Sequence, residues 1–474
     1  MKSRVRLKNI WIYILSFSAS AFGIALNFFL ARVLEADLFG KLQYLIALCT
    51  TCSQLLIFGI NSFLIREAKN EKRNKSLVSD CYTLFFVIVL FVAPIMFYFL
   101  YNHVAYTSFN FVLTILVIAV SFLMGLSALI SAYYQGSDKY HISVILENLI
   151  PKFILFALSV LFFAIGKIFE FQKNYLLIYL IIYLAIAIPL FIKTFRGFSF
   201  KLKLVDIKSI CFFFGVTATY SLGNNLTKVL QGGLYKNTVA LGIISISLSI
   251  VSLVTIFTNV LSNIIKPIYA KKSREKDADG LLNDYRFNTR LNSYICIPLY
   301  LFFILHARNF LYIFGESYTV FPVILILIAL TNMINDLTGP NGTMLSMIGK
   351  EKWELFNGLL YFAVYFACVF IFSFDEITGL CFALLIGQIA VNVAKFLEIS
   401  VIFKKFPLDL KTIFTELLII GVNFGVIFVL RFISSFALWL VLGILVGIVL
   451  VFVNCFILSF YRKSDFKTLL SLKL

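Results

Sequence analysis

The chain has 474 residues, of which 61% are hydrophobic, 17% aromatic and only 14% charged. A soluble domain needs far less apolar surface, whereas a bilayer core about 30 Å thick requires runs of about 20 apolar residues for each crossing helix. The apolar runs are continuous and do not alternate with polar residues, which excludes a transmembrane β-barrel. The sequence therefore predicts an all-α polytopic membrane protein.

The first apolar segment follows the basic stretch MKSRVRLK, is too long for a signal peptide and lacks a small-residue cleavage site. We interpret it as a retained first helix. We expect about 14 transmembrane helices, at residues 10–33, 42–65, 81–101, 111–134, 143–166, 175–195, 211–233, 239–265, 291–313, 321–341, 355–374, 378–402, 413–432 and 437–460.

The net charge of +18 arises from 41 basic and 23 acidic residues. If the N-terminus is cytoplasmic, the segments between predicted helices carry 31 Lys and Arg residues on that side and seven on the outer side. Cytoplasmic loops of membrane proteins are rich in Lys and Arg. The charge therefore predicts cytoplasmic termini and gives no reason to expect a nucleic-acid partner.

An internal repeat divides the chain. The loop YYQGSDKYH at 133–141 has a counterpart, SMIGKEKWE, at 346–354, and VLEADLFGKLQY at 33–44 has a looser one, LYKNTVALGIIS, at 234–245. The repeat predicts two pseudo-symmetric six-helix lobes, residues 1–200 and 201–405, with two additional helices and a cytoplasmic tail in 406–474. Repeats with an even number of helices are parallel, and a substrate site lies between them.

The stretch GTMLSMIGKEKWE at 342–354 superficially resembles a phosphate-binding loop. That loop has four residues between its glycines and a Ser or Thr after its lysine, whereas here six residues separate Gly342 from Gly349 and Glu351 takes the hydroxyl position. A glutamate would repel phosphate. We interpret the stretch as a cytoplasmic turn in which Gly349 lets the chain leave a helix.

Polar stripes follow one face of the predicted first, second, seventh and eighth helices. Ser16, Ser20, Gly23 and Asn27 share a face of the first helix, because residues three and four apart are neighbours on a helix. Such residues commonly join packed helices, but stripes at equivalent places in both lobes favour a shared hydrophilic cavity. The amides that we expect to bind substrate are Asn27, Asn61, Asn224, Gln231, Asn259 and Asn263.

Basic residues near these stripes are candidates for anion binding, although snorkelling to the headgroups is the alternative at helix ends. The candidates are Lys228, Arg32, Arg66, Arg286 and Arg290.

Three other sets of ionisable residues fall within the predicted helices. Asp336 is the candidate for ion coupling, because acids inside a bilayer are usually functional. Lys395 has Glu398 three residues on, which predicts an ion pair within one helix. Lys152 follows Pro151, and its acidic neighbour Glu147 is five residues away, a poor spacing for pairing.

The sequence shows no catalytic arrangement. The three histidines lack metal-ligand spacing, and neither a Ser-His-Asp set nor a carboxylate pair is apparent. We therefore predict a protein that is not an enzyme and has no metal and no cofactor.

LARVLEADLFGKLQYLIAL at 30–48, the two loop sequences and VLSNIIKPIYAKKSREKD at 260–277 resemble the polysaccharide and O-antigen repeat-unit flippases. These belong to the multidrug/oligosaccharidyl-lipid/polysaccharide exporter superfamily. The resemblance implies two six-helix lobes, alternating access and a cationic cavity lined chiefly by helices 1, 2, 7 and 8. Few basic residues lie deep within the predicted helices of this chain, which is a departure from that pattern.

The resemblance leads to the hypothesis of a flippase for a polyprenyl-diphosphate-linked oligosaccharide, an O-antigen or other surface polysaccharide repeat unit. The expected location is the bacterial cytoplasmic (inner) membrane. The expected partners are the lipid-linked substrate, membrane lipids and polysaccharide polymerase components, with a monomer as the functional form. An ion-coupled multidrug exporter of the same fold and a membrane glycan polymerase are the alternatives.

Overall fold

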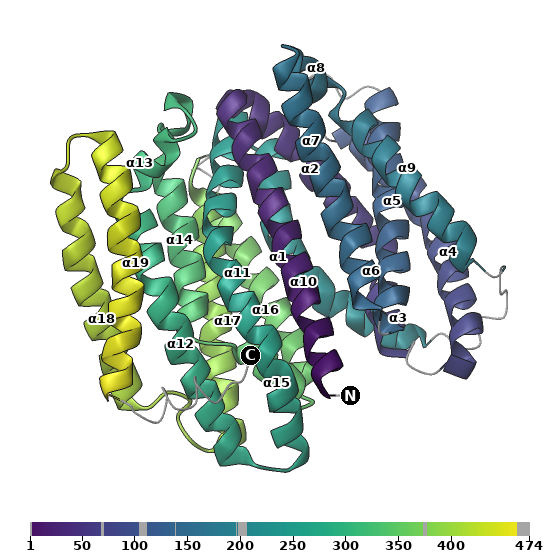
Figure 1. Cartoon of the computed structure of the whole chain (residues 1–474). Coiled ribbons are helices and arrows are strands. Elements are labelled where there is room, and N and C mark those ends of the chain that lie inside the picture. Colours follow the sequence, from purple (N-terminus) through teal and green to yellow (C-terminus); the bar gives the residue numbers. More distant parts are fainter. Residues whose placement is uncertain are drawn as a thin grey trace. The chain divides into compact units, whose positions relative to one another are not determined.

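The computed structural model of this chain describes residues 2–67, 71–103, 111–137, 139–195, 197, 206–372 and 377–461 (Figure 1). Every regular element in these ranges is a helix. The predicted all-α class is therefore confirmed. The chain packs as two compact units, Met1–Ile246 and Ser247–Leu474. The lobe boundaries near residues 200 and 405 remain a prediction.

The described residues contain nine helices that are long and apolar enough to cross a membrane. The number becomes ten if α14 (Pro322–Leu337) and α15 (Asn341–Met347), which meet at an angle of 44°, form one broken span. The chain is thus a multi-pass membrane protein, while the predicted count of 14 is not confirmed. Polar side chains such as Gln43 and Gln54 lower the hydropathy of helices such as α2 (Ala36–Ile57).

The first unit is built around α5, whose small residues let neighbours approach closely. A Cβ added at Gly125 would lie 3.2 Å from the Phe85 ring, and Val117 and Val120 are fully buried beside it. The helices of this unit are α1 (Lys2–Val33), α2, α3 (Ile60–Glu67), α4 (Glu71–His103), α5 (Phe111–Gly136), α6 (Tyr140–Val144), α7 (Ile150–Ala164), α8 (Ile168–Lys173), α9 (Tyr175–Thr194), α10 (Ile207–Gly233) and the start of α11 (Thr238–Arg274).

One turn of π-helix, η1 (Ile145–Leu149), directly precedes α7. Pro151 explains it. Proline has no N–H to donate to the carbonyl group four residues earlier, which belongs to Glu147, and its ring would collide with that carbonyl group in a regular α-helix. The wider turn accommodates the ring and changes which side chains share a face.

The second unit is organised by α12, which packs against α14, α18 and α19. The ring of Trp439 on α19 is fully buried between Phe302 and Phe310, with ring centroids 5.6 and 5.4 Å away. Besides the rest of α11, the unit contains α12 (Ala278–Leu305), α13 (Ala307–Tyr312), η2 (Glu316–Tyr318), α14, α15, α16 (Glu351–Ile371), α17 (Gly379–Phe403), α18 (Leu410–Val429), η3 (Leu430–Phe432) and α19 (Phe436–Tyr461).

Both repeat loops are turns between helices. Gly136 ends α5 before α6 begins at Tyr140, and the second loop joins α15 to α16. Gly349 has a φ of 76°, a left-handed conformation that glycine adopts without steric cost. The prediction that Gly349 lets the chain leave a helix is confirmed.

Candidate functional site

A track of polar side chains joins α1, α2 and α10 inside the first unit. Gln43 on α2 donates from Nε2 to Oδ1 of Asn27 on α1 at 3.1 Å. The Lys228 ammonium on α10 donates to Oε1 of Gln43 at 3.2 Å. Because Gln43 is almost fully buried, its amide is fixed as a bridge between the other two groups. We call Asn27, Gln43 and Lys228 the amide–lysine track.

Close packing of α10 on α2 places these side chains together. A Cβ added at Gly232 would lie 2.2 Å from the Tyr44 ring, so this position has no room for a larger residue. Gln231 precedes that glycine and is fully buried. Glycine at the helix crossing thus lets Lys228, one turn earlier, reach Gln43.

Gln43 is not among the substrate-binding residues that were predicted from the sequence. It lies seven residues before Thr50, and Gln54 continues the same face of α2, whereas Asn61 lies on α3 beyond the break at Phe58 and Gly59. Two helical turns separate positions seven apart, so extending the stripe toward the start of the helix would have found it. The partner of Gln43 on α10, 185 residues away, has no such signal.

A charged group lies at the start of α2. Asp37 accepts hydrogen bonds from Lys41 at 2.6 Å and from Thr238 at the start of α11. Burial alone would raise the pKa of Asp37, but the hydrogen bonds from Lys41 and Thr238 lower it below its usual value.

A second polar group surrounds the π turn. Glu147 accepts a hydrogen bond from Ser131 on α5, whose hydroxyl also pairs with that of Ser143 at 2.6 Å. Glu147 and Lys152 interact electrostatically. Because η1 is a turn of π-helix, residues five apart lie closer to one face here than in an α-helix. The predicted poor spacing for pairing stays a prediction.

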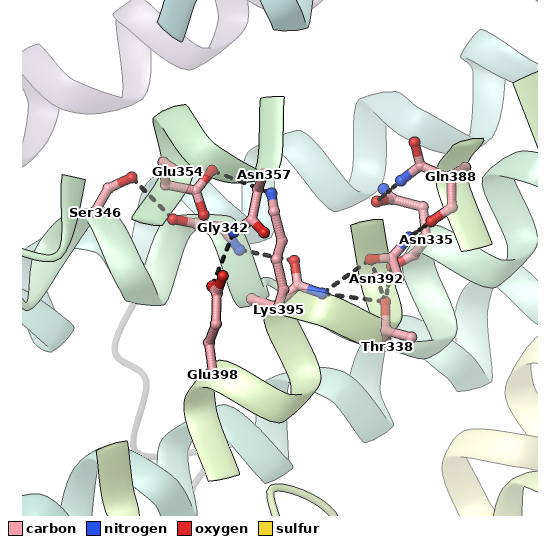
Figure 2. Close-up of polar contacts among 11 residues, drawn as sticks. Asn335, Thr338, Gly342, Ser346, Glu354, Asn357, Gln388, Asn392, Lys395 and Glu398 are labelled. Carbon is pink, nitrogen blue, oxygen red and sulfur yellow. Dashed lines mark hydrogen bonds and ion pairs between the residues drawn. The ribbon is translucent and has the colours of Figure 1, made fainter. Parts of the chain in front are cut away.

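In the second unit, Figure 2 shows a cluster between α16 and α17. The Lys395 ammonium donates to Glu354 at 3.1 Å, and both side chains are at least 93% buried. Asn357 donates to Glu398 at 2.8 Å. The sequence predicted Glu398 as the partner of Lys395, and the two interact electrostatically. The hydrogen bond of Lys395, however, goes to Glu354 on the neighbouring helix, because α16 and α17 pack side by side.

The same face of α17 meets the break between α14 and α15. Asn392 accepts hydrogen bonds from Thr338 at 2.8 Å and from Asn341 at 2.9 Å, as Figure 2 shows for Thr338. Gln388 donates to Asn335 at 2.7 Å. These amides satisfy polar groups where the helix is interrupted, a requirement inside a bilayer.

The remaining predicted residues of the second unit have other partners. Asp336 is buried and accepts a hydrogen bond from Tyr300 at 2.7 Å. Arg286 donates to the backbone carbonyl groups of Phe406 and Pro407. Arg290 is buried and donates to Thr412 on α18 at 3.1 Å, and Asn259 is exposed on α11.

The structure thus joins two of the predicted substrate residues, Asn27 and Lys228, through the amide of Gln43. Arg32 is exposed in the last turn of α1. Asn61 is half-buried on α3, and its Oδ1 has no hydrogen-bond partner among the described residues. The side chains of Arg66, Asn224 and Asn263 lie outside the described part of the chain.

Comparison with known proteins shows to which family this chain belongs. Residues 29–322 match the family model described as "Polysaccharide biosynthesis protein". The chain belongs to this family of polysaccharide biosynthesis proteins. The matched range includes the amide–lysine track except for Asn27, two residues before its start.

Solved structures share the fold of this family member. The lipid II flippase MurJ in an inward closed conformation is similar with a TM-score of 0.66 and 15% identity, covering 95% of this chain and 99% of that one. An inward-facing multidrug resistance MATE family transporter of the MOP superfamily gives 0.58 and 12%, covering 83% and 98%. Among curated proteins, no sequence matches this chain.

Proposed function

We propose that this protein is a flippase that moves a polyprenyl-diphosphate-linked oligosaccharide, such as an O-antigen repeat unit, from the cytoplasmic to the outer leaflet of the bacterial inner membrane. The observation that carries the proposal is the amide–lysine track. Among the described residues, the Lys228 ammonium is held by the neutral amide of Gln43 and forms no ion pair with a carboxylate. Its positive charge is therefore available to an anionic ligand.

The chemistry of the track suits such a substrate. A lysine ammonium binds phosphate as a compact point charge, and charge-assisted hydrogen bonds are roughly twice as strong as neutral ones. The amides of Asn27 and Gln43 offer donors and acceptors of the kind that sugar hydroxyl groups need. The polyprenyl tail needs no site in the protein because it is soluble in the bilayer.

We place Asn27, Gln43, Lys228 and Gln231 at the centre of the proposed site. The other sequence-derived candidates remain predictions, as do cytoplasmic termini, a functional monomer and contact with polymerase components. The solved structures of similar fold are transporters, which supports a transport function and not an enzymatic one.

The test is the production of surface polysaccharide by cells in which the chromosomal gene is replaced by Lys228→Ala or Lys228→Arg. We expect severe loss with alanine and partial activity with arginine, because arginine keeps the charge. Lys173→Ala, which removes an exposed lysine at the end of α8, is the matched control. Normal polysaccharide with normal amounts of the Lys228→Ala protein in the membrane would contradict the proposal.

An ion-coupled multidrug exporter is the second candidate, and one observation favours it. Asp336 is a buried acidic residue within α14 that accepts a hydrogen bond from the Tyr300 hydroxyl, and acidic residues inside a bilayer commonly bind protons or cations. If this candidate is correct, a strain carrying Asp336→Asn will be sensitive to cationic drugs and will have intact surface glycans. The reverse pattern would support the flippase.

A further inference from the structure

We propose that Lys152 on α7 is a second cation of the substrate site, placed so that the diphosphate is held between it and Lys228. This inference rests on the proposed function and adds a specificity-determining residue to it. It depends on three observations about the first unit: the register of α7 on α1, the absence of a side chain at Gly23, and the anchoring of Glu147.

Aromatic side chains fix how α7 lies against α1. The ring of Phe22 meets that of Phe153 edge-on at 5.1 Å, and the ring of Phe29 meets those of Phe156 and Phe163 at 6.2 and 5.6 Å. Edge-to-face pairs at this spacing are favourable beyond the area that they bury. Contacts two helical turns apart prevent α7 from sliding along α1, and this register brings Lys152 to Gly23.

Gly23 provides the space for the lysine side chain. A Cβ added at Gly23 would lie 3.2 Å from Cδ and 3.6 Å from the ammonium nitrogen of Lys152. The end of the lysine side chain therefore lies directly on the backbone of α1. A larger residue at this position would displace the ammonium group.

Gly23 belongs to the same polar stripe as Asn27. Residues four apart on one helix face are about 6 Å apart, and Asn27 is joined through Gln43 to Lys228. One face of α1 is thus flanked by two lysines, Lys152 beside Gly23 and Lys228 beside Asn27. A diphosphate has two phosphate groups, and two cations along one stripe suit it better than a monophosphate.

Glu147 is an acidic residue that interacts electrostatically with Lys152. Its carboxylate accepts a hydrogen bond from Ser131 on α5, whose hydroxyl also pairs with that of Ser143 on α6. These bonds hold the carboxylate in place when the lysine turns toward a ligand. The ammonium lies at the end of a flexible stem and can exchange this carboxylate for a phosphate. Its charge is therefore compensated before the substrate binds and after it has bound.

The experiment measures binding of undecaprenyl diphosphate and undecaprenyl monophosphate to the full-length protein, purified in detergent. We expect the wild-type protein to prefer the diphosphate. Lys152→Gln should weaken diphosphate binding about tenfold or more, the loss of one charged hydrogen bond, with little effect on the monophosphate. Gly23→Val, which keeps the lysine and fills its place, should have the same effect, whereas Lys173→Gln should have none.

A double variant separates binding from folding. Where two opposite charges compensate each other inside a protein, replacing both by neutral residues is often tolerated, whereas removing one is destabilising. Glu147→Gln/Lys152→Gln should therefore restore the unfolding temperature lost in Lys152→Gln but not diphosphate binding. Recovery of both would show that Lys152 only balances Glu147, and the inference would be overturned.

The outcomes for the wild type and for Lys228→Gln distinguish the two proposals. If the wild-type protein binds neither lipid, the proposed function itself fails. If it binds the diphosphate, Lys228→Gln weakens that binding and Lys152→Gln does not, then the flippase proposal stands and the role of Lys152 is refuted. A loss in both variants, with the preference over monophosphate reduced in Lys152→Gln, supports the inference.

Discussion

Gly40 on α2 and Gly242 on α11 each face the backbone of the other helix. A Cβ at Gly40 would lie 1.9 Å from the carbonyl oxygen of Thr238, and a Cβ at Gly242 would lie 2.3 Å from that of Ala36. The two glycines, 202 residues apart and paired by the sequence repeat, thus make reciprocal contacts. Backbones can approach this closely only where neither residue has a side chain.

Alanine at either glycine should therefore destabilise the first unit. Overpacking typically costs about 1–3 kcal/mol, and here the obstacle is backbone, which cannot rotate away. We expect Gly40→Ala and Gly242→Ala to lower the thermal unfolding temperature in detergent. Gly425→Ala on α18, where nothing lies within 4 Å of the added Cβ, should be neutral or stabilising. Equal unfolding temperatures for all three variants would show that the backbones of α2 and α11 do not approach each other this closely.

Gln43→Leu should impair transport as severely as a change at Lys228. Leucine preserves the volume but removes the group that accepts from Lys228 and donates to Asn27, so both polar partners lose a buried hydrogen bond, at about 1–3 kcal/mol for each group left unsatisfied. Surface polysaccharide per molecule of protein in the membrane is the measurement. Gln54→Leu on the same helix is the control, and an equal defect there would argue for a general effect on α2.

The ion pair between Lys395 and Glu354 should contribute to folding through mutual compensation. Lys395→Met leaves a buried carboxylate alone, which typically costs about 3–5 kcal/mol, whereas an uncharged replacement of both partners is often neutral. We expect Lys395→Met to lower the unfolding temperature and Lys395→Met/Glu354→Gln to recover most of it. If the double variant is as unstable as the single one, the lysine has a role beyond neutralising Glu354.

Arg290 is predicted from the sequence to bind substrate, whereas the structure shows it in contact with α18. Its guanidinium is buried, donates to Thr412 on α18 and lies in the field of Glu416. Arg290→Met should lower the unfolding temperature, because it leaves Glu416 without this compensation. Transport per folded molecule should be preserved, and exposed Arg308→Met is the control. Loss of transport at unchanged stability would instead support the predicted role of Arg290 in binding substrate.

The hydrogen bonds of Asp37 should make stability depend on pH in the acid range. Because these bonds lower the pKa of Asp37, its contribution is present above its usual pKa and is lost as the pH falls through the lowered value. The side chain is 39% exposed, so the effect of Asp37→Asn at about pH 7 should be at most about 1 kcal/mol. Unfolding midpoints of the two proteins should converge as the pH falls below the lowered pKa of Asp37. A constant difference would exclude this carboxylate as the cause.

Local sequence patterns were sufficient to predict the helices and several turns of this protein. The length and continuity of the apolar runs predict helices throughout, and the structure describes helices there. The repeat glycines Gly136 and Gly349 mark turns, because glycine is favoured where a chain leaves a helix. The period of the helix also places Asn27 and Gly23 on one face.

Partners on other helices could not be predicted in this way. Lys395 has an acid three residues on, yet it donates to Glu354, 41 residues earlier, because α16 and α17 pack together. The π turn before Pro151 was likewise not predicted, and it changes which side chains near Glu147 and Lys152 share a face.

The sequence by itself determined the helical class and the membrane environment and placed Gly23 and Asn27 on one helix face, because these depend on composition and on a fixed helical repeat. Tertiary structure alone decided that Gln43 bridges Asn27 to Lys228 and that Lys152 rests on Gly23. Such contacts depend on how side chains of different helices interlock, and no periodicity within one segment encodes that arrangement.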